Sequence, residues 1–423
     1  MKINLLSNYN KTVLYTYFAV LAMAVITSLW VLGKNRSEAI AERFTQIKSH
    51  EHQVELLLDS GIRAVTSLNQ YATKHLSLSE APRIDLLLSY YYYSYNSIDQ
   101  VFEIVPNIQE DLQDKFQFEI GLISGTGNLE NRSDQYYREM DMIFEMNLSF
   151  PVAMEMVPDA TRVYYLSANE FIGVYPWPGD DYAFKKSTLQ SPAYLSSLKK
   201  HNPKGHTYWT DVYADDAGKG LMTTVGSPLY IGDQYYGALA IDITLSSLSE
   251  ELLPQGGLFG DMLLVDGNNN VMAHSEVQKN QITQSIEGLD AHLPVELTKL
   301  GSERLFAMTK GQLLNGYYVQ AVELVNAPFK LIYFEKEQDL FADSWRQFVV
   351  SLVSITLALS ILLSVVHWLA KRSFIGPASR LMVHLENCAK EPISPPSHTA
   401  AAWLPFFSLI SKTFSENKSY TRQ

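Results

Sequence analysis

The sequence has one cysteine among its 423 residues, Cys388, which stands near the C-terminal end. The long segment before it therefore cannot form an internal disulfide bond, even in an oxidising compartment where such bonds are common. We expect that segment to be stabilised by the burial of side chains alone.

Motifs of several enzyme classes are also missing. The sequence has no Gly-x-Gly-x-x-Gly before a helix, no phosphate-binding loop, no His-Glu-x-x-His and no Gly-x-Ser-x-Gly. These absences exclude the dinucleotide, nucleotide, zinc-protease and serine-hydrolase sites that such motifs build. An exported enzyme with a site made of scattered acidic residues stays open as a hypothesis that no motif supports.

A metal site is not expected either. Asp266, Asn268 and Asn270 begin like a calcium-binding loop, but Val271 stands where that loop requires glycine and Val277 where it requires a bidentate glutamate. We interpret this segment as a hairpin turn, and we expect neither a metal nor a cofactor.

Charged side chains are absent from two long apolar runs, residues 13–32 and 348–370, which contain no Asp, Glu, Lys or Arg. Each is long enough to cross a hydrocarbon core about 30 Å thick. Gly33-Lys34-Asn35-Arg36 follows the first run and offers no small-residue cleavage site, so we predict an uncleaved anchor. A cleaved signal peptide is the alternative.

The charge of the remaining segments predicts an orientation. Residues 1–12 and 371–423 are short and rich in Lys and Arg, whereas residues 33–347 hold the acidic excess of a chain whose net charge is −12. Short basic segments stay in the cytoplasm and long domains cross regardless of charge. We therefore predict a two-pass protein of the bacterial inner membrane, embedded in the lipid bilayer, with both termini cytoplasmic and the middle in the periplasm. An acidic exterior also argues against a nucleic-acid partner.

Apolar residues at heptad spacing run from Ile40 to Ala72, with Glu51 and Gly61 as interruptions. This pattern predicts a long stalk helix over residues 37–80.

Beyond the stalk the pattern changes to short segments rich in β-branched and aromatic residues, which is typical of antiparallel strands. In a first module, residues 81–250, these segments are 101–105, 162–166, 171–175, 207–213, 221–230 and 235–244. In a second module, residues 251–340, they are 262–265, 271–274, 305–308, 316–323 and 330–334. The predicted fold class is α+β, with two antiparallel-sheet modules on one stalk and a boundary near residues 250–260. Helical stretches are expected again at 374–388 and 403–423.

Aromatic and acidic residues are crowded in the first module: Tyr164, Tyr165, Tyr175, Trp177, Tyr194, Tyr208, Trp209, Tyr213, Asp211, Asp215 and Asp242. Aromatic faces and carboxylates together favour a cationic amine, through cation–π attraction and charge-assisted hydrogen bonds. The alternative is structural, because tyrosines on strands usually form cores or interfaces and aspartates at strand ends usually cap turns.

Three segments carry a resemblance to a known family: YWTDVYAD at 208–215, MTTVGSPLY at 222–230 and GALAIDIT at 237–244. They resemble the distal module of double Cache (dCache) sensors, the extracytoplasmic input domains of bacterial histidine kinases, diguanylate cyclases and chemoreceptors. Residues 262–274 and 317–334 resemble the proximal module. The resemblance implies a PAS-like distal sheet that binds a small molecule and a homodimer that shifts its second membrane helix.

The resemblance also implies site residues. Tyr213, Asp215 and Asp242 match the half of the family's site that holds a ligand ammonium group. Ser191-Pro192-Ala193-Tyr194 stands where the family has an Arg-x-Trp-Tyr carboxylate clamp, and it keeps only Tyr194. Without a guanidinium there, an amine is favoured over an α-amino acid. Asp211, Tyr175 and Trp177 complete the expected ligand-binding set.

The expected function is transmembrane signal transduction by a periplasmic small-molecule sensor. Residues 371–423 are similar to HAMP-like linkers, and neither a phosphoacceptor-histidine box nor a Gly-Gly-Asp-Glu-Phe motif follows. We therefore expect an input half without catalytic activity, whose histidine kinase or diguanylate cyclase output is absent from this chain. The alternative function is a membrane-anchored interaction module that docks a periplasmic binding protein.

Overall fold

The computed structural model describes residues 5–78, 91–106, 121–158, 160–179, 182–215, 220–251, 259–275, 285–391 and 393–420. The chain forms two compact units, one of Ile40–Leu340 and the other of Met1–Ala39 with Phe341–Gln423. Each is described by itself.

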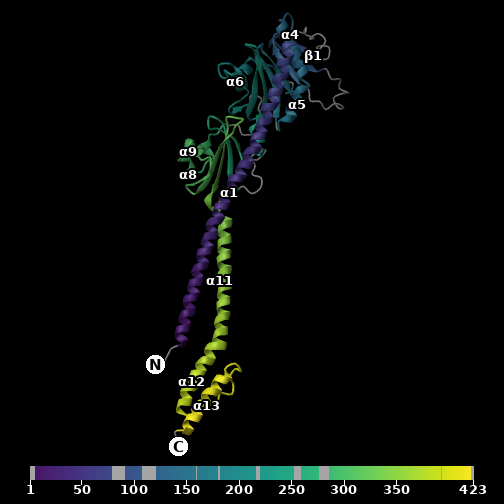
Figure 1. Cartoon of the computed structure of the whole chain (residues 1–423). Helices are drawn as coiled ribbons and strands as arrows, with labels where there is room; N and C mark the ends of the chain where they lie inside the picture. Colours follow the sequence, from purple (N-terminus) through teal and green to yellow (C-terminus); the bar gives the residue numbers. More distant parts are fainter. Residues whose placement is uncertain are drawn as a thin grey trace. The chain divides into compact units, whose positions relative to one another are not determined.

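The larger unit contains the second half of helix α1 (Leu5–Ser77), which runs beside two sheets (Figure 1). The heptad positions Ile47, Val54, Leu58, Val65 and Leu68 are buried, so the predicted stalk helix and its buried face are confirmed. Gly61 is part of this contact rather than an interruption. A Cβ atom at Gly61 would lie 3.2 Å from the Val225 Cγ1 and 3.5 Å from the Trp209 ring. The glycine therefore permits close packing of the helix on the sheet.

The first sheet has the strand order β1-β2-β3-β5-β4-β9-β8-β6, with β7 paired to β8, and all of its strand pairs are antiparallel. Its strands are β1 (Tyr91–Asn96), β2 (Val101–Pro106), β3 (Leu122–Thr126), β4 (Ala160–Ser167), β5 (Phe171–Tyr175), β6 (Tyr208–Trp209), β7 (Tyr213–Ala214), β8 (Leu221–Ile231) and β9 (Gln234–Thr244). The helices of this part are α4 (Asp134–Met146), α5 (Ser149–Met156), η1 (Lys186–Gln190), α6 (Pro192–Ser197) and α7 (Leu245–Glu251).

Successive side chains of a strand point to opposite faces of its sheet, and this alternation gives the first sheet two different faces. Tyr165 of β4 points toward α4, where its hydroxyl donates to Glu139. Tyr164, its neighbour, belongs to an apolar cluster on the other face with Leu122, Ile172 and Tyr194. The candidate site described below lies on the Tyr164 face.

The second sheet has the order β11-β10-β14-β13-β12 and is also antiparallel. Its strands are β10 (Asp261–Val265), β11 (Val271–His274), β12 (Gln312–Leu314), β13 (Tyr317–Glu323) and β14 (Lys330–Lys336). The short helices η2 (Leu289–Ala291), α8 (Val295–Thr298), α9 (Ser302–Phe306) and α10 (Glu337–Leu340) belong to this part. Leu263, Leu297, Leu305 and Ile332 are fully or almost fully buried in one cluster, which gives this module its own core.

The α+β fold with two antiparallel sheets and a long N-terminal helix is confirmed, but two strand predictions need correction. Residues 305–308 were predicted as a strand. Leu305 instead lies in helix α9, and its side chain is buried in the core. A short apolar run suits a buried helix as well as a strand. Residues 207–213 form two short strands, because the Thr210 Oγ1 accepts from the Thr224 amide at 2.9 Å and interrupts the regular ladder.

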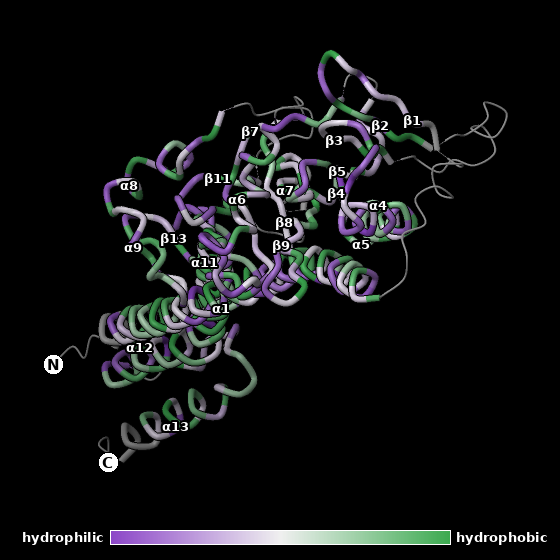
Figure 2. Tube along the Cα trace, turned by 90° about the horizontal axis from the view of Figure 1, so that it is seen from above, coloured by the Kyte–Doolittle hydropathy of each residue, from purple (hydrophilic) through white to green (hydrophobic). Residues whose placement is uncertain are grey.

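The smaller unit contains the first part of α1 together with α11 (Ala342–Ala370), the π-helical turn Lys371–Ile375, α12 (Gly376–Lys390) and α13 (Leu404–Tyr420). Two helical stretches, Lys11–Ser77 and Ala342–Lys390, are long and apolar enough to cross a membrane, and Figure 2 shows the apolar colouring of α11. The Tyr17 hydroxyl lies 3.3 Å from the Ser360 hydroxyl, and the Asn35 amide donates to Gln347 at 3.0 Å. The apolar helices expected at both ends of the sensor are therefore present.

Helices α12 and α13 run in the same direction. Trp403, just before α13, donates from Nε1 at 3.0 Å to the carbonyl of Ser373, in the π-helical turn just before α12. Further along both helices the His384 Nε2 lies 2.9 Å from the Ser411 hydroxyl. A connector must therefore return along the pair between Lys390 and Leu404.

Candidate ligand-binding site

The site is centred on Asp242, a carboxylate near the C-terminal end of β9 that is only 4 % exposed. Three hydroxyl groups surround its Oδ1 atom. Those of Tyr164 and Thr224 donate to it at 2.8 and 2.7 Å, and that of Tyr213 at 3.2 Å. The Tyr213 and Thr224 hydroxyls also lie 2.6 Å from each other, so the cluster is one hydrogen-bonded network.

Strand register explains why these residues meet. Strand β9 lies between β4 and β8, and Asp242 is directly opposite Arg162 on one side and Thr224 on the other. Tyr164 stands two residues after Arg162 and so faces the same side of the sheet. Tyr213 joins them because β7 pairs with the start of β8.

Burial raises the pKa of the Asp242 carboxyl, because a charged group loses its hydration there, and the three hydroxyl donors and the nearby Arg162 charge oppose this shift. Burial and the nearby carboxylate also raise the pKa of the Tyr164 and Tyr213 hydroxyls, which therefore stay protonated and act as donors. Among the described residues, no hydrogen bond reaches the Asp242 Oδ2. The Asp242 Oδ2 can therefore accept a hydrogen bond from a cationic group.

A guanidinium also belongs to the site. The Arg162 Nη1 lies 3.1 Å from the Asp215 Oδ1, with 11 % and 9 % of the two side chains exposed. Burial raises the pKa of the Tyr182 hydroxyl to about 12. The charges of Arg162, Asp242 and Asp215 also influence this pKa, so Tyr182 lies near all three. The sequence analysis overlooked Arg162, although its place on the strand that flanks Asp242 was the signal that could have found it.

The other expected residues lie in different surroundings. Tyr194 of α6 packs in the Tyr164 cluster, where its ring stacks edge-on against Tyr235 at 6.0 Å. The alternation of β5 places Tyr175 on the face opposite Val174 and Tyr164, and the Trp177 side chain is 43 % exposed. The Asp211 carboxylate is on the surface and accepts from the Asn268 amide at 2.7 Å.

The structure thus brings Tyr213, Asp215 and Asp242 together and places Tyr194 beside them. Tyr175, Trp177 and Asp211 are not part of this network. The site also contains Tyr164, Thr224 and Arg162, which were not in the expected ligand-binding set. The arrangement is a buried anionic centre ringed by hydroxyl donors and aromatic rings, which is suited to holding a small cation.

Residues 146–250 match the family model described as the methyl-accepting chemotaxis protein-like first PDC sensor domain. The chain carries a chemoreceptor-like PDC sensor domain. The matched segment of this PDC domain includes every residue of the network around Asp242. It runs from the last residue of α4 to α7 and so covers most of the first sheet.

Solved structures of chemoreceptor domains are also similar to this chain. The ligand-binding domain of Campylobacter jejuni Tlp3 in complex with L-valine is 14 % identical, covers 74 % of this chain and 98 % of that chain, and gives a TM-score of 0.43. The domain of Pseudomonas aeruginosa PctC in complex with GABA is 10 % identical, covers 70 % and 100 %, and gives 0.39. That of Pseudomonas fluorescens CtaA in complex with L-serine is 14 % identical, covers 44 % and 81 %, and gives 0.32. The comparison with curated protein sequences gave no match.

Proposed function

We propose that this PDC sensor binds a small cationic amine at Asp242 and relays its occupancy across the membrane. The observation that carries the proposal is the arrangement at Asp242, where Oδ1 accepts from three hydroxyls and Oδ2 accepts from none of the described residues. A primary ammonium group has three N–H donors and would satisfy Oδ2 with a charge-assisted hydrogen bond.

The surroundings of Asp242 support an amine. Tyr164, Tyr182 and Tyr213 bring aromatic rings close to Asp242, and aromatic rings attract cations. The segment Ser191-Pro192-Ala193-Tyr194, which caps and begins α6, provides no positive side chain for a ligand carboxylate. A buried carboxylate is costly unless its charge is balanced, and among the described residues only hydroxyl groups contact the Asp242 carboxylate directly, so a bound cation would offset part of that cost.

The proposal includes a topology and a signalling role. The sensor domain lies in the periplasm as part of a homodimer, the two apolar stretches cross the inner membrane, and both termini are cytoplasmic. Ligand binding favours one arrangement of the sensor domain over another and thereby shifts the second membrane helix, with a coupling of about 1–3 kcal/mol that is typical of such switches. The output is a kinase or cyclase reached through α12 and α13.

Titration calorimetry on the full chain in lipid nanodiscs, with n-butylamine as the probe, tests the amine assignment. Asp242→Asn keeps the shape of the side chain and removes its charge, so we expect affinity to fall by at least about tenfold, the effect of losing about 1.4 kcal/mol. Glu139→Gln is the matched control, because Glu139 is an equally buried carboxylate on the opposite face of the same sheet. Equal affinity in wild type and Asp242→Asn, or no binding to wild type, contradicts the assignment.

A further inference from the structure

Arg162 and Asp215 form a largely buried ion pair beside Asp242. Arg162 stands at the edge of the network, directly opposite Asp242 in the strand register, and its guanidinium contacts the Asp215 carboxylate at 3.1 Å. Both side chains are largely buried. Among the described residues, the binding region therefore contains two carboxylates and one guanidinium, and the guanidinium contacts one of the two.

Buried charges are tolerated when they are paired, and an unpaired buried charge costs several kcal/mol. Arg162 contacts Asp215 directly, whereas Asp242 accepts hydrogen bonds from neutral hydroxyl groups and is influenced by the Arg162 charge without a direct contact. With two carboxylates and one guanidinium, the described part of this region has one negative charge in excess. A ligand with a single ammonium group balances that charge and leaves the occupied site neutral.

We propose that Arg162 is a specificity-determining residue, a built-in counter-ion on Asp215 that restricts the site to ligands with one positive charge. This inference rests on the proposed amine-binding function. A diamine would place its second ammonium group near Asp215, which Arg162 already occupies, and the two cations would repel each other. The residue thereby discriminates by charge rather than by size.

The same geometry argues against Arg162 as a clamp for a ligand carboxylate. Its charge is already neutralised by Asp215, so its attraction for another anion is reduced. A ligand carboxylate would also be the third carboxyl group in a region that holds one guanidinium among the residues described above. Zwitterions should therefore bind more weakly than the monoamine with the same carbon chain.

Three probes with a four-carbon chain separate these possibilities: n-butylamine with one positive charge, putrescine with two, and γ-aminobutyrate as a zwitterion. We expect the wild-type full chain in nanodiscs to bind n-butylamine most tightly in calorimetry. Arg162→Gln removes the guanidinium beside Asp215, so a second ammonium group is no longer repelled there, and the affinity of putrescine relative to n-butylamine should rise at least tenfold. Arg162→Lys keeps the charge and should retain the wild-type order of the probes.

Asp215→Asn provides an independent test if Arg162→Gln does not fold. It leaves Arg162 without its counter-ion, so the affinity of γ-aminobutyrate relative to n-butylamine should rise at least tenfold. In the double variant Arg162→Gln/Asp215→Asn both charges are gone, and the gain in putrescine binding should disappear. Circular dichroism of each variant verifies that the fold is retained.

Two results would overturn the assignment of Arg162 while leaving the amine site intact. One is wild-type binding of n-butylamine with the putrescine preference unchanged in Arg162→Gln. The other is tighter wild-type binding of γ-aminobutyrate than of n-butylamine, lost in Arg162→Gln, since this would make Arg162 a carboxylate clamp. Failure of all three probes to bind the wild type would instead remove the proposed function on which the inference rests.

Discussion

The amide nitrogen of Val212 donates a hydrogen bond to the Asp266 Oδ2 at 3.3 Å, and this bond joins the two sheet modules. Val212 directly precedes Tyr213 of the candidate site, and Asp266 begins the turn between β10 and β11. Beside this bond, the side-chain amide of Asn268 donates to the Asp211 carboxylate at 2.7 Å. A shift of Tyr213 on ligand binding would therefore act on the first hairpin of the second module.

Removing the Asp266 carboxylate should loosen this junction. Asp266 is buried, and its carboxylate also accepts from the backbone N–H groups of Asn268 and Asn270 at 2.9 and 2.8 Å. Asp266→Ala therefore leaves several donors unsatisfied. We expect a loss of about 1–3 kcal/mol in the free energy of unfolding, together with faster amide exchange at Val212. Asp290→Ala, on an exposed carboxylate of the same module, should change neither quantity. Unchanged exchange at Val212 in Asp266→Ala would contradict the role of this junction.

The stability of the sensor domain should fall as the pH rises, because of Glu139. Burial raises the pKa of this carboxyl to about 7, against the opposing effect of donors from Ser167, Tyr165 and Asn169. A pKa above the unfolded value means that the folded state binds the proton more tightly. The resulting stabilisation is fully present below the unfolded pKa of about 4.5 and is lost as the pH rises through about 7.

Thermal unfolding of the full chain between about pH 5 and pH 8 measures this effect. Asp242 and Glu335 also have raised pKa values from burial, so the wild-type curve alone is not specific for Glu139. The difference between wild type and Glu139→Gln isolates it, since the amide does not titrate. We expect the wild-type midpoint to fall more steeply with pH than the variant midpoint. Parallel curves would show that Glu139 does not titrate in this range.

An ion pair between Arg43 of α1 and Glu335 of β14 should be important for holding the helix on the second sheet. The Arg43 Nε and Nη2 lie 2.8 and 3.1 Å from the two carboxylate oxygens, and the Tyr333 hydroxyl donates to Glu335 at 2.9 Å. Arg43→Met leaves a buried carboxylate without its cation, which costs about 3–5 kcal/mol in comparable cases. The double variant Arg43→Met/Glu335→Met should recover much of that loss in chemical unfolding. Additive losses in the double variant would argue against coupling of the pair.

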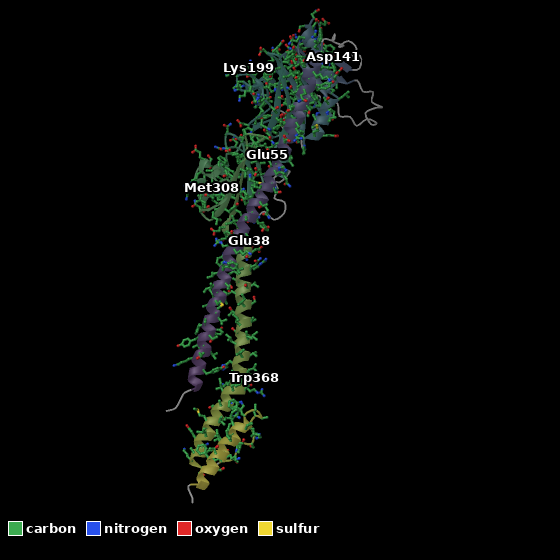
Figure 3. All side chains as sticks on the ribbon, viewed as in Figure 1. Glu38, Glu55, Asp141, Lys199, Met308 and Trp368 are labelled. Atoms are coloured by element: carbon green, nitrogen blue, oxygen red, sulfur yellow. The ribbon has the colours of Figure 1, made fainter. Side chains whose placement is uncertain are left out.

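The same helix contacts the second module through Glu55, labelled on α1 in Figure 3, whose carboxylate accepts from the Val325 and Asn326 amides. This exposed contact is expected to contribute less than the buried Arg43–Glu335 pair, because exposed groups are better solvated.

The proposed topology predicts which residues a membrane-impermeant maleimide reaches in intact cells. In a Cys388→Ser background, Ile98→Cys and Val325→Cys place thiols at positions that are 90 % and 89 % exposed in the two modules, and Leu409→Cys places one on α13 that is 64 % exposed. We expect the first two to be labelled once the outer membrane is permeabilised, and the third only after the inner membrane is opened. Labelling of all three at the same stage would contradict the orientation.

Local sequence patterns were sufficient for much of the fold. Strands β4, β5, β8 and β9 and their turns follow from β-branched and aromatic segments bounded by turn residues, and the buried face of α1 follows from its heptad spacing. Leu305 was misassigned because a short buried apolar run has no period that distinguishes strand from helix.

The site was only partly predictable, because it depends on pairing between distant strands. Tyr213 and Asp242 were expected together from a resemblance, and the structure brings them into one network. Arg162 was overlooked because its partner Asp215 lies far away in the sequence, just after β7, and only the register of β4 and β9 places Arg162 beside Asp242. Asp211 was expected in the site as one of the acidic residues among the aromatic residues of the first module, yet its carboxylate accepts a hydrogen bond from Asn268, and its ligand role remains a prediction.

The most direct test of the central claim is an experimental structure of the full chain with n-butylamine bound. The account predicts that the ammonium nitrogen lies within hydrogen-bonding distance, about 2.7–3.2 Å, of the Asp242 Oδ2, while Arg162 remains paired with Asp215. Density for the amine away from Asp242, or bound to Asp215 with Arg162 displaced, would contradict it.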